Sequence, residues 1–485
     1  MNDNSPVDVL LTYPSDGPRI FSPMMPIGLV SIGTVLKKAG YRVKIIDFNF
    51  YGNDFRKELE LLKPRIIGIG GTTPSRSGSF LTARIAKEVL PDVNVVYGGI
   101  NATFTSAETL KSVTEIDYIL KGEGEFSFLE FCNVITGKSD KTVEQIPGLC
   151  WRTPQGVVEN KAERICDLSA IPVADRELLG DNYRLEMEFI GGEGDFLMTS
   201  RGCPAACNFC SAARMFPGGV RTRPVDSVME EVDYLLGRKK LTGLKIFDST
   251  FTANKEHVHD FCKSVKEYKI PWECEIRADT VDKDLLQLMK ESGCYYINIG
   301  METSDMKHLK HISKGISPEQ VLNVLETCKD LDIRSKVFFT FGHMGQTFSE
   351  CLKDIRFIQN NRARIDFFAV TVGMRIFPGT RLEREWRKCE LNDKKFSWTR
   401  SAKSFKNLMI MEPGDIPVLY QKQLGPLKLS AILLILIFRR LVCTEKFLLR
   451  MALLNLIGFF KFLQLQFRYT SHRLSRLSGR LRHNL

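Results

Sequence analysis

One loop, RGCPAACNFC, constrains this chain most, because it places three cysteines in the spacing C-x3-C-x2-C. Cys203, Cys207 and Cys210 cannot all pair with one another as disulfides, and one loop can turn all three toward a single centre. Three ligands are one short of the four that tetrahedral zinc or a closed iron–sulfur cluster requires. The spacing therefore predicts a metal centre, either an open catalytic site or a structural zinc knuckle whose fourth ligand lies elsewhere.

Length and composition indicate a globular protein of two or three domains. The chain has 485 residues, of which 44% are hydrophobic and 26% charged, and a domain usually holds ~100–200 residues. Its 13 cysteines are too sparse for a disulfide-stabilised scaffold. The first residues, MNDNSPVDVLL, lack the basic start and long apolar run of a signal peptide. We therefore expect a cytoplasmic protein whose thiols stay reduced.

The positive charge is confined to the C-terminal tail. Of the net charge of +11, +10 lies in residues 428–485, where Glu445 is the one acidic residue, so residues 1–427 are nearly neutral. No RNA-binding fold or basic surface interleaved with aromatic residues is evident before the tail. We therefore expect no nucleic-acid partner.

Residues 1–145 alternate short β-rich runs with helical stretches, and residues 146–188 form a joining segment. Continuous Val and Ile runs between helices predict a parallel, doubly wound, Rossmann-like sheet. The runs expected as strands are 7–14, 41–49, 64–73, 93–99 and 116–125.

Ligands of such sheets bind beyond the carboxyl ends of the strands. The residues expected there are small or polar: Pro14, Thr72, Gly98, Gly99, Gly122 and Glu123. Glycines at these ends let a backbone approach a flat or phosphate-bearing ligand, or they are only tight packing turns. The dinucleotide fingerprint G-x-G-x-x-G is absent after the first strand.

Residues 189–415 repeat the strand–helix alternation. Six strands are expected, of which the first runs into the cysteine loop: 195–203, 244–251, 272–279, 295–305, 334–345 and 365–380. Six such units close into a partial TIM-type barrel, whose chemistry lies at the carboxyl ends of its strands. The fold class is therefore α/β throughout, with a helical tail over residues 416–485.

The cysteine spacing directly after the first barrel strand resembles the radical S-adenosylmethionine (SAM) superfamily, over about residues 189–412. The resemblance implies that Cys203, Cys207 and Cys210 hold a 4Fe-4S cluster, and that Phe209 contacts the adenine of SAM. It also implies that Asp248 and Ser249 hold the amino group of SAM.

Two further strand ends match this family. The acid Glu302 corresponds to the residue near the SAM ribose or its supporting arginine, for which Arg277 is the candidate, and the turn FPGT (residues 377–380) matches the sixth strand. Two departures are that DST replaces the usual pair of acids and that FGHMGQT replaces G-x-P-G-E-T. His343 therefore stands at a strand end, as a loop hydrogen-bonding residue or a catalytic candidate.

The turns of residues 1–145 resemble the cobalamin-binding domain that precedes many radical SAM enzymes. The matching pieces are P-x-G-L at 26–29, the Gly98–Gly99 turn and G-E-G-E at 122–125. The D-x-H-x-x-G motif is missing, so the resemblance implies cobalamin without a histidine ligand from the first loop, or a domain that has lost the cofactor.

The two resemblances together imply a cobalamin-dependent radical SAM enzyme. Its 4Fe-4S cluster would take an electron from flavodoxin or ferredoxin and cleave SAM to a 5′-deoxyadenosyl radical, and the expected reaction is methylation of an unactivated carbon of a small molecule. One alternative is a cyclase or other ring-forming radical SAM enzyme that acts on a porphyrin or an isoprenoid lipid. The other is a zinc-stabilised binding protein without catalysis.

The tail, residues 416–485, combines two apolar stretches, residues 429–438 and 447–467, with basic residues. Arg439, Arg450 and Lys461 recur every 11 residues and so share one helical face. A broad apolar surface with a narrow basic stripe is typical of a helix in a membrane interface. A cap on the barrel or a dimer contact explains the pattern equally well. A membrane-bound tail, on the inner face of the membrane, would imply a lipophilic substrate.

Overall fold

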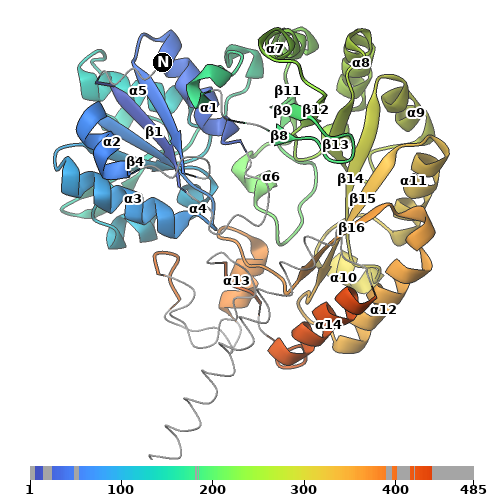
Figure 1. Cartoon of the computed structure of the whole chain (residues 1–485). Helices are drawn as coiled ribbons and strands as arrows, with labels where there is room; N and C mark the ends of the chain where they lie inside the picture. Colours follow the sequence, from blue (N-terminus) through green and yellow to red (C-terminus); the bar gives the residue numbers. More distant parts are fainter. Residues whose placement is uncertain are drawn as a thin grey trace, which may run out of the picture.

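The structure, a computed structural model, describes residues 6–14, 25–48, 54–180, 183, 185–388, 396–400, 416–419 and 421–439. Two sheets, each covered by helices, lie side by side and are joined by a linker (Figure 1). The α/β class and the order of the two units agree with the sequence analysis.

The first sheet has the strand order β2-β1-β3-β4-β5-β6-β7. Its first five strands in that order are parallel: β1 (Val9–Tyr13), β2 (Val43–Asp47), β3 (Ile66–Gly70), β4 (Asn94–Gly98) and β5 (Tyr118–Leu120). One apolar core lies between the sheet and the helices α1 (Ile27–Lys38) and α5 (Glu125–Thr136). A second core lies under α2 (Phe55–Leu62), α3 (Arg76–Val89) and α4 (Ile100–Ser112). The sheet is therefore doubly wound, because both faces are buried.

A hairpin extends this sheet beyond the expected end of the domain. Strands β6 (Leu149–Thr153) and β7 (Gly156–Glu159) are antiparallel, and β6 pairs with β5. The boundary expected at residue 145 therefore falls inside the sheet, and the joining segment begins after Glu159.

The second sheet is the expected partial barrel of six parallel strands. They are β9 (Glu193–Leu197), β12 (Gly243–Ile246), β13 (Trp272–Ile276), β14 (Cys294–Glu302), β15 (Arg334–Phe341) and β16 (Phe367–Val372). Helices α7 (Val225–Arg238), α8 (Lys255–Val265), α9 (Lys283–Glu291), α11 (Pro318–Asp330) and α12 (Phe348–Asn360) line its outer face (Figure 1). Apolar side chains on alternate strand positions pack against these helices and form the largest core.

The joining segment packs against the amino end of the barrel. It adds the short antiparallel strand β8 (Leu185–Glu186) to β9. Glu188 then accepts a hydrogen bond from Tyr296 Oη at 3.0 Å and pairs with Lys336 at 3.0 Å. Phe189 stacks on Phe367 with ring centroids 4.1 Å apart. These partners lie near the starts of β14, β15 and β16, so the joining segment covers part of the amino end of the barrel, although Phe189 itself stays 44% exposed.

The first helix of the tail packs on the barrel. Helix α14 (Pro426–Phe438) buries Leu429, Ile432, Leu433 and Leu436 in the barrel core, beside α12 and β16. This part of the tail is therefore the barrel cap that the sequence left open, although Leu434 and Phe438 on its other side are exposed. Among the described residues, no helix has the length and apolar character needed to cross a bilayer. The second apolar stretch, residues 447–467, lies outside the described residues.

A group of four charged residues joins the two units, and we call it the interdomain clamp: Glu123, Glu125, Arg201 and Arg221. Arg201 donates to Glu123 at 2.7 Å and to Glu125 at 2.5 Å, and Arg221 donates to Glu123 at 2.8 Å. The acids follow β5, whereas the arginines lie on the short paired strands β10 (Ser200–Arg201) and β11 (Arg221–Thr222) at either end of the cysteine loop. All four side chains are nearly buried, so each charge depends on its partners.

Truncating Leu436 tests whether α14 is a structural cap. Leu436 is fully buried and Leu434, on the same helix, is 53% exposed. Leu436→Ala should lower the free energy of unfolding by about 2–5 kcal/mol because it leaves a cavity. The matched variant Leu434→Ala should change it by less than about 0.5 kcal/mol. Urea denaturation followed by circular dichroism measures both, and equal effects would contradict the packing of α14.

Removing one charge from the interdomain clamp should destabilise the contact between the two units. Glu123→Gln leaves Arg201 and Arg221 without a full counter-charge in a buried place, at a cost on the order of 3 kcal/mol. Limited proteolysis within the joining segment should become faster, and urea unfolding should begin earlier. Glu163→Gln, at an exposed position of the same segment, is the matched control, and a clamp variant that behaves like it would refute the role of the clamp.

Candidate active site

The cysteine loop lies at the carboxyl end of the barrel, between β10 and the short helix α6 (Ala212–Met215). Backbone hydrogen bonds fix its middle, since Asn208 donates to Ile312 O at 2.8 Å and accepts from Leu382 N at 2.9 Å. Its first turn needs glycine, because Gly202 has φ +106° and a Cβ there would lie 2.6 Å from Gly219 O. The loop therefore has one defined path along which its thiols are presented.

The three thiols lie on one loop and make few contacts of their own. Cys203 Sγ lies 3.4 Å from Thr250 Oγ1, after β12, and Cys210 Sγ accepts from Ala212 N at 3.4 Å. The three sulfur atoms do not all lie within 4.8 Å of one another. Thiolates on one tetrahedral zinc, with bonds of ~2.3 Å, would be ~3.8 Å apart. The three thiols are therefore not gathered as closely as the ligands of one zinc ion.

Asp248, expected to hold the amino group of SAM, has a structural set of partners. Its carboxylate accepts from Thr199 N at 2.8 Å and from Thr199 Oγ1 and Ser200 Oγ at 2.6 Å each. Burial raises the pKa of this carboxyl, while the hydrogen bonds oppose that shift. Asp248 therefore ties the end of β12 to the residues that lead into the cysteine loop. Ser249 beside it is exposed.

Glu302 stands at the end of β14 in a strained conformation. It has φ +72°, and the pairing of β14 with β15 shifts by one residue there. Such strain in a residue other than glycine persists where the surroundings enforce it, often at functional sites. Gly300 makes room, because a Cβ there would lie 2.6 Å from Lys314 Nζ and 2.9 Å from Glu302 Oε1.

The partner of Glu302 is Lys314, which the sequence analysis missed. Lys314 Nζ donates to Glu302 Oε1 at 2.9 Å, and Thr340 Oγ1 donates to Glu302 Oε2 at 3.0 Å. Burial alone would raise the pKa of Glu302, but the charge and hydrogen bond of Lys314 lower it. Burial also raises the pKa of the Cys207 thiol, and the charge of Lys314 acts against that rise. Lys314 therefore sits between the cysteine loop and Glu302, and no motif in the sequence marks it.

Arg277 does not pair with Glu302, which corrects the sequence-based expectation. Its guanidinium donates to both oxygens of Asp279, at 2.9 and 2.7 Å, and to Lys314 O at 2.7 Å. Arg277 thus supports the loop that carries Lys314. The reason is local, because an acid two residues away in the chain is a nearer partner than one on the next strand.

His343 is fully buried behind Glu302. Its Nε2 lies 3.4 Å from Glu302 O, and burial lowers its pKa to about 4. The imidazole is therefore neutral near pH 7 and is not a cation of the site. Gln421, from the tail, donates to His343 O at 3.0 Å and accepts from Gly345 N at 2.6 Å. The tail thus holds the loop after β15.

Phe209 and the FPGT turn complete the barrel side of the site. Phe209 is partly buried and packs against both the barrel core and a small apolar cluster around Trp386 and Trp398. In the FPGT turn, a Cβ on Gly379 would collide with the ring of Phe104 from α4. The carboxyl end of the barrel therefore touches the first domain.

The residues expected to face cobalamin do come to one edge of the first sheet. Because β1, β3, β4 and β5 are adjacent and parallel, their carboxyl ends line up, and the residues that follow them include Pro14, Thr72, Gly98, Gly99, Gly122 and Glu123. This edge is the one from which the interdomain clamp reaches the cysteine loop.

These residues differ in what they can do. Gly99 has φ +94°, and a Cβ there would lie 2.6 Å from Gly71 O, so it is a packing turn. A Cβ on Gly98 would meet only Leu120 O at 3.8 Å, which leaves space for a ligand. Glu123, expected at the cofactor, uses both oxygens for Arg201 and Arg221 instead. Two buried donors of Arg221, Nε and Nη2, have no hydrogen-bond partner and fit a ligand that carries acceptors.

Comparison with protein-family models identifies both units. The model of the B12 binding domain matches residues 19–131, and the model of the radical SAM superfamily matches residues 197–358. The second match contains the cysteine loop, Asp248, Glu302 and His343.

Comparison with individual proteins agrees. An uncharacterized methyltransferase of Pyrococcus horikoshii is 31% identical over 365 residues, which are 74% of this chain and 77% of that protein. The anaerobic magnesium-protoporphyrin IX monomethyl ester cyclase of Rubrivivax gelatinosus is 28% identical over 348 residues, which are 69% and 62% of the two chains.

A solved structure shows the same fold. It is the radical S-adenosylmethionine methyltransferase TsrM of Kitasatospora setae, with a TM-score of 0.68 at 18% identity over 87% of this chain and 88% of that one. Together with the two family matches and the Pyrococcus relative, this shows that the chain belongs to the radical SAM superfamily and is a radical SAM enzyme with a B12-binding domain ahead of its barrel.

Proposed function

We propose that this enzyme transfers a methyl group from cobalamin to a carbon atom of a small molecule held between its two domains. When bound, the 4Fe-4S cluster would supply the electron that cleaves one SAM to methionine and a 5′-deoxyadenosyl radical, and this radical would remove the hydrogen atom from the substrate carbon. Cobalamin would supply the methyl group, which it would regain from a second SAM with one further electron from the reductant. The observation that carries the proposal is the interdomain clamp, because it brings the cysteine loop to the glycine-lined edge of the first sheet.

Each part of the site has a defined task in this proposal. Cys203, Cys207 and Cys210 hold three irons of the cluster and leave the fourth for the amino and carboxylate groups of SAM. Lys314 and Glu302 form a buried pair beside Cys207 that orients the polar end or the ribose of SAM by charge-assisted hydrogen bonds. Asp248 acts one step away, since it fixes the strand end from which the cysteine loop starts.

On the cobalamin side, the backbone does most of the binding. Gly98 leaves room for the flat ring system, and the free donors of Arg221 can bind its amide oxygens. No histidine stands in the described part of the first loop, so no protein ligand to cobalt is expected from it. The substrate is expected at the carboxyl end of the barrel, because the cysteine loop lies there and the first domain touches this end.

A second candidate is a radical SAM cyclase, and the cyclase of Rubrivivax gelatinosus is the observation that favours it. Methylation is preferred because the Pyrococcus methyltransferase is more similar and is covered over more of its length. A lipophilic substrate delivered by a membrane-bound tail, and an electron supply from flavodoxin or ferredoxin, remain predictions.

The cluster assignment is tested by replacing the three cysteines of the loop. After anaerobic reconstitution with iron and sulfide, the unaltered chain should hold about four irons and should form 5′-deoxyadenosine from SAM when a strong reductant is added. Cys203→Ala, Cys207→Ala and Cys210→Ala combined should abolish both. Cys166→Ala, at an exposed cysteine outside the loop, is the control. Equal iron loading in the triple variant would refute the assignment.

The cobalamin assignment is tested at Gly98. Gly98→Leu should fold normally, because its Cβ has space, but its side chain should occupy the place of the ring. The visible absorbance of cobalamin that stays with the protein on gel filtration should fall at least tenfold. Thermal unfolding of the cobalamin-free protein should stay within about 2 °C of the unaltered chain. Cobalamin retained in full by this variant would contradict the proposed edge.

Labelled SAM separates the two candidate reactions. With SAM that carries a labelled methyl group, methylation places the label in the product, whereas a cyclase leaves it in methionine. Extracts of a deletion strain serve as the source of substrate.

A further inference from the structure

We propose that Asp305, His308 and Glu350 form a binding site for a divalent transition-metal ion that links α10 (Met306–His311) to α12. This site is separate from the cysteine loop and from the cobalamin edge. It does not depend on the proposed reaction.

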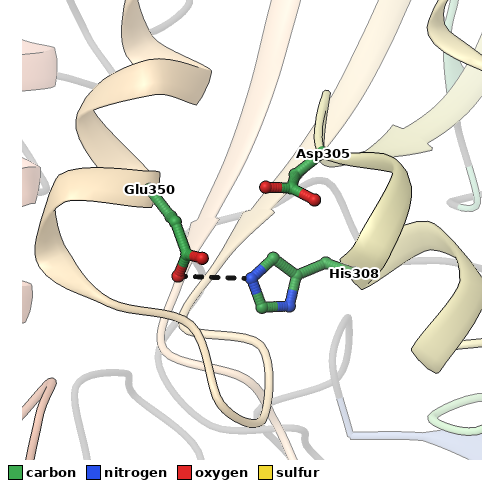
Figure 2. A group of neighbouring side chains, drawn as sticks. All are labelled: Asp305, His308 and Glu350. Carbon is green, nitrogen blue, oxygen red and sulfur yellow. Dashed lines mark ion pairs between the residues drawn. The ribbon is translucent and has the colours of Figure 1, made fainter.

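The three side chains lie close together (Figure 2). His308 lies on α10 and Glu350 on α12, and Asp305 is the N-cap residue that precedes α10. One ligand atom from each lies within 4.8 Å of the other two, and His308 Nε2 lies 3.4 Å from Glu350 Oε2. Two ligands bound to one ion at ~2.1 Å and at a tetrahedral angle would be ~3.4 Å apart. The spacing of the imidazole and the carboxylate is therefore that of two neighbouring ligands.

His308 provides an independent observation. Its side chain is 1% exposed, and its Nε2 has no hydrogen-bond partner. This nitrogen faces Glu350 Oε2 at 3.4 Å, in a contact that is an ion pair only when the imidazole is protonated (Figure 2). A neutral imidazole therefore leaves this buried nitrogen facing the carboxylate without a hydrogen bond. A native structure rarely leaves such an atom unpaired. A metal ion between the two groups would satisfy it.

Helix capping explains the carboxylates only in part. Asp305 accepts from Lys307 N at 2.8 Å with Oδ1, and Glu350 accepts from Thr347 N at 2.7 Å with Oε2. Asp305 Oδ2 and Glu350 Oε1 take no part in these caps, whereas Glu350 Oε2, the oxygen that faces His308, accepts from both the amide and the hydroxyl of Thr347. An ion at this site would therefore be bound through Glu350 Oε1 or would share Oε2 with the cap. The nearest charge to Glu350 Oε1 is Lys307 Nζ at 3.9 Å, on a side chain that is 75% exposed and can turn away. Capping gives no reason for the buried imidazole.

An ion can reach the site from solvent. A wide, open hollow of about 610 Å³ lies against His308 and is bordered by His311, Met344 and Gly345. One imidazole and two carboxylates are a ligand set suited to Mn²⁺, Fe²⁺ or Zn²⁺. Water from the hollow can complete the coordination.

The place of the site suggests what the ion would do. Asp305 follows Glu302 by three residues, and the ring of His308 lies 6.4 Å from that of His343, nearly parallel to it. An ion here would hold together the loops after β14 and β15, which carry Glu302 and His343. It would be a positioning ion rather than a reactive one.

The test uses the full chain with its cluster loaded, so that the three cysteines are occupied. Mn²⁺ is titrated at room temperature, and the loss of the free-ion EPR signal is measured. We expect one bound Mn²⁺ per chain, displaced by Zn²⁺, and a higher melting temperature in its presence. His308→Ala should weaken binding at least tenfold, and His311→Ala, on the same short helix, should bind as the unaltered chain does.

Glu350→Gln is a second variant that tests the site even if His308→Ala does not fold. Its amide oxygen still accepts from Thr347 and keeps the cap, so the helix should remain intact by circular dichroism while Mn²⁺ binding weakens at least tenfold. The proposal is overturned if the unaltered chain binds no Mn²⁺ or Zn²⁺ at millimolar concentration. It is also overturned if both Glu350→Gln and a folded His308→Ala keep full affinity, because the bound ion then lies elsewhere.

Discussion

The interaction on which the site depends most is the buried pairing of Arg201 with Glu123 and Glu125. Two acids of the first domain and two arginines around the cysteine loop neutralise one another's charge in a place where little water can solvate them. Such a network is not a strong source of net stability, because desolvation offsets much of the attraction. Its value lies in geometry, since bidentate pairs of this kind accept few other arrangements. The position of the loop relative to the first sheet is thereby fixed by charge.

The other features of the site follow from that placement. The strained Glu302, the buried Lys314 and the neutral His343 lie on successive loops of the barrel, and each is held by a neighbour rather than by solvent. The tail contributes as well, because Gln421 binds the backbone around His343. The site is therefore assembled from both domains and from the C-terminal segment, and no single stretch of the chain contains it.

Sequence periodicity and spacing were enough to predict both sheets, the barrel and the cysteine loop, because these depend on local patterns. The pairings were not predictable in the same way. Arg277 was expected to reach Glu302 but binds the adjacent Asp279, and Lys314 carries no motif at all. Glu123 lies in a recognisable G-E-G-E run, yet its partners come from residues 201 and 221. Which acid meets which base depends on how the two units pack, and that information is not local. The hairpin β6–β7 likewise belongs to the first sheet only through the pairing of β6 with β5, which no local pattern of the joining segment indicates.

The contacts of Glu188 and Phe189 with the amino end of the barrel determine where a fragment of the protein can begin. Both residues belong to the segment that joins the domains, so a barrel fragment that starts at β9 would lack them. Phe367 and Tyr296 would then be more exposed to solvent at the amino end of the barrel, and Lys336 would lose its counter-charge. A soluble fragment should therefore begin before Leu185. The joining segment also connects the two domains covalently. A rotation of the first domain would therefore be transmitted to the amino end of the barrel through Glu188 and Phe189.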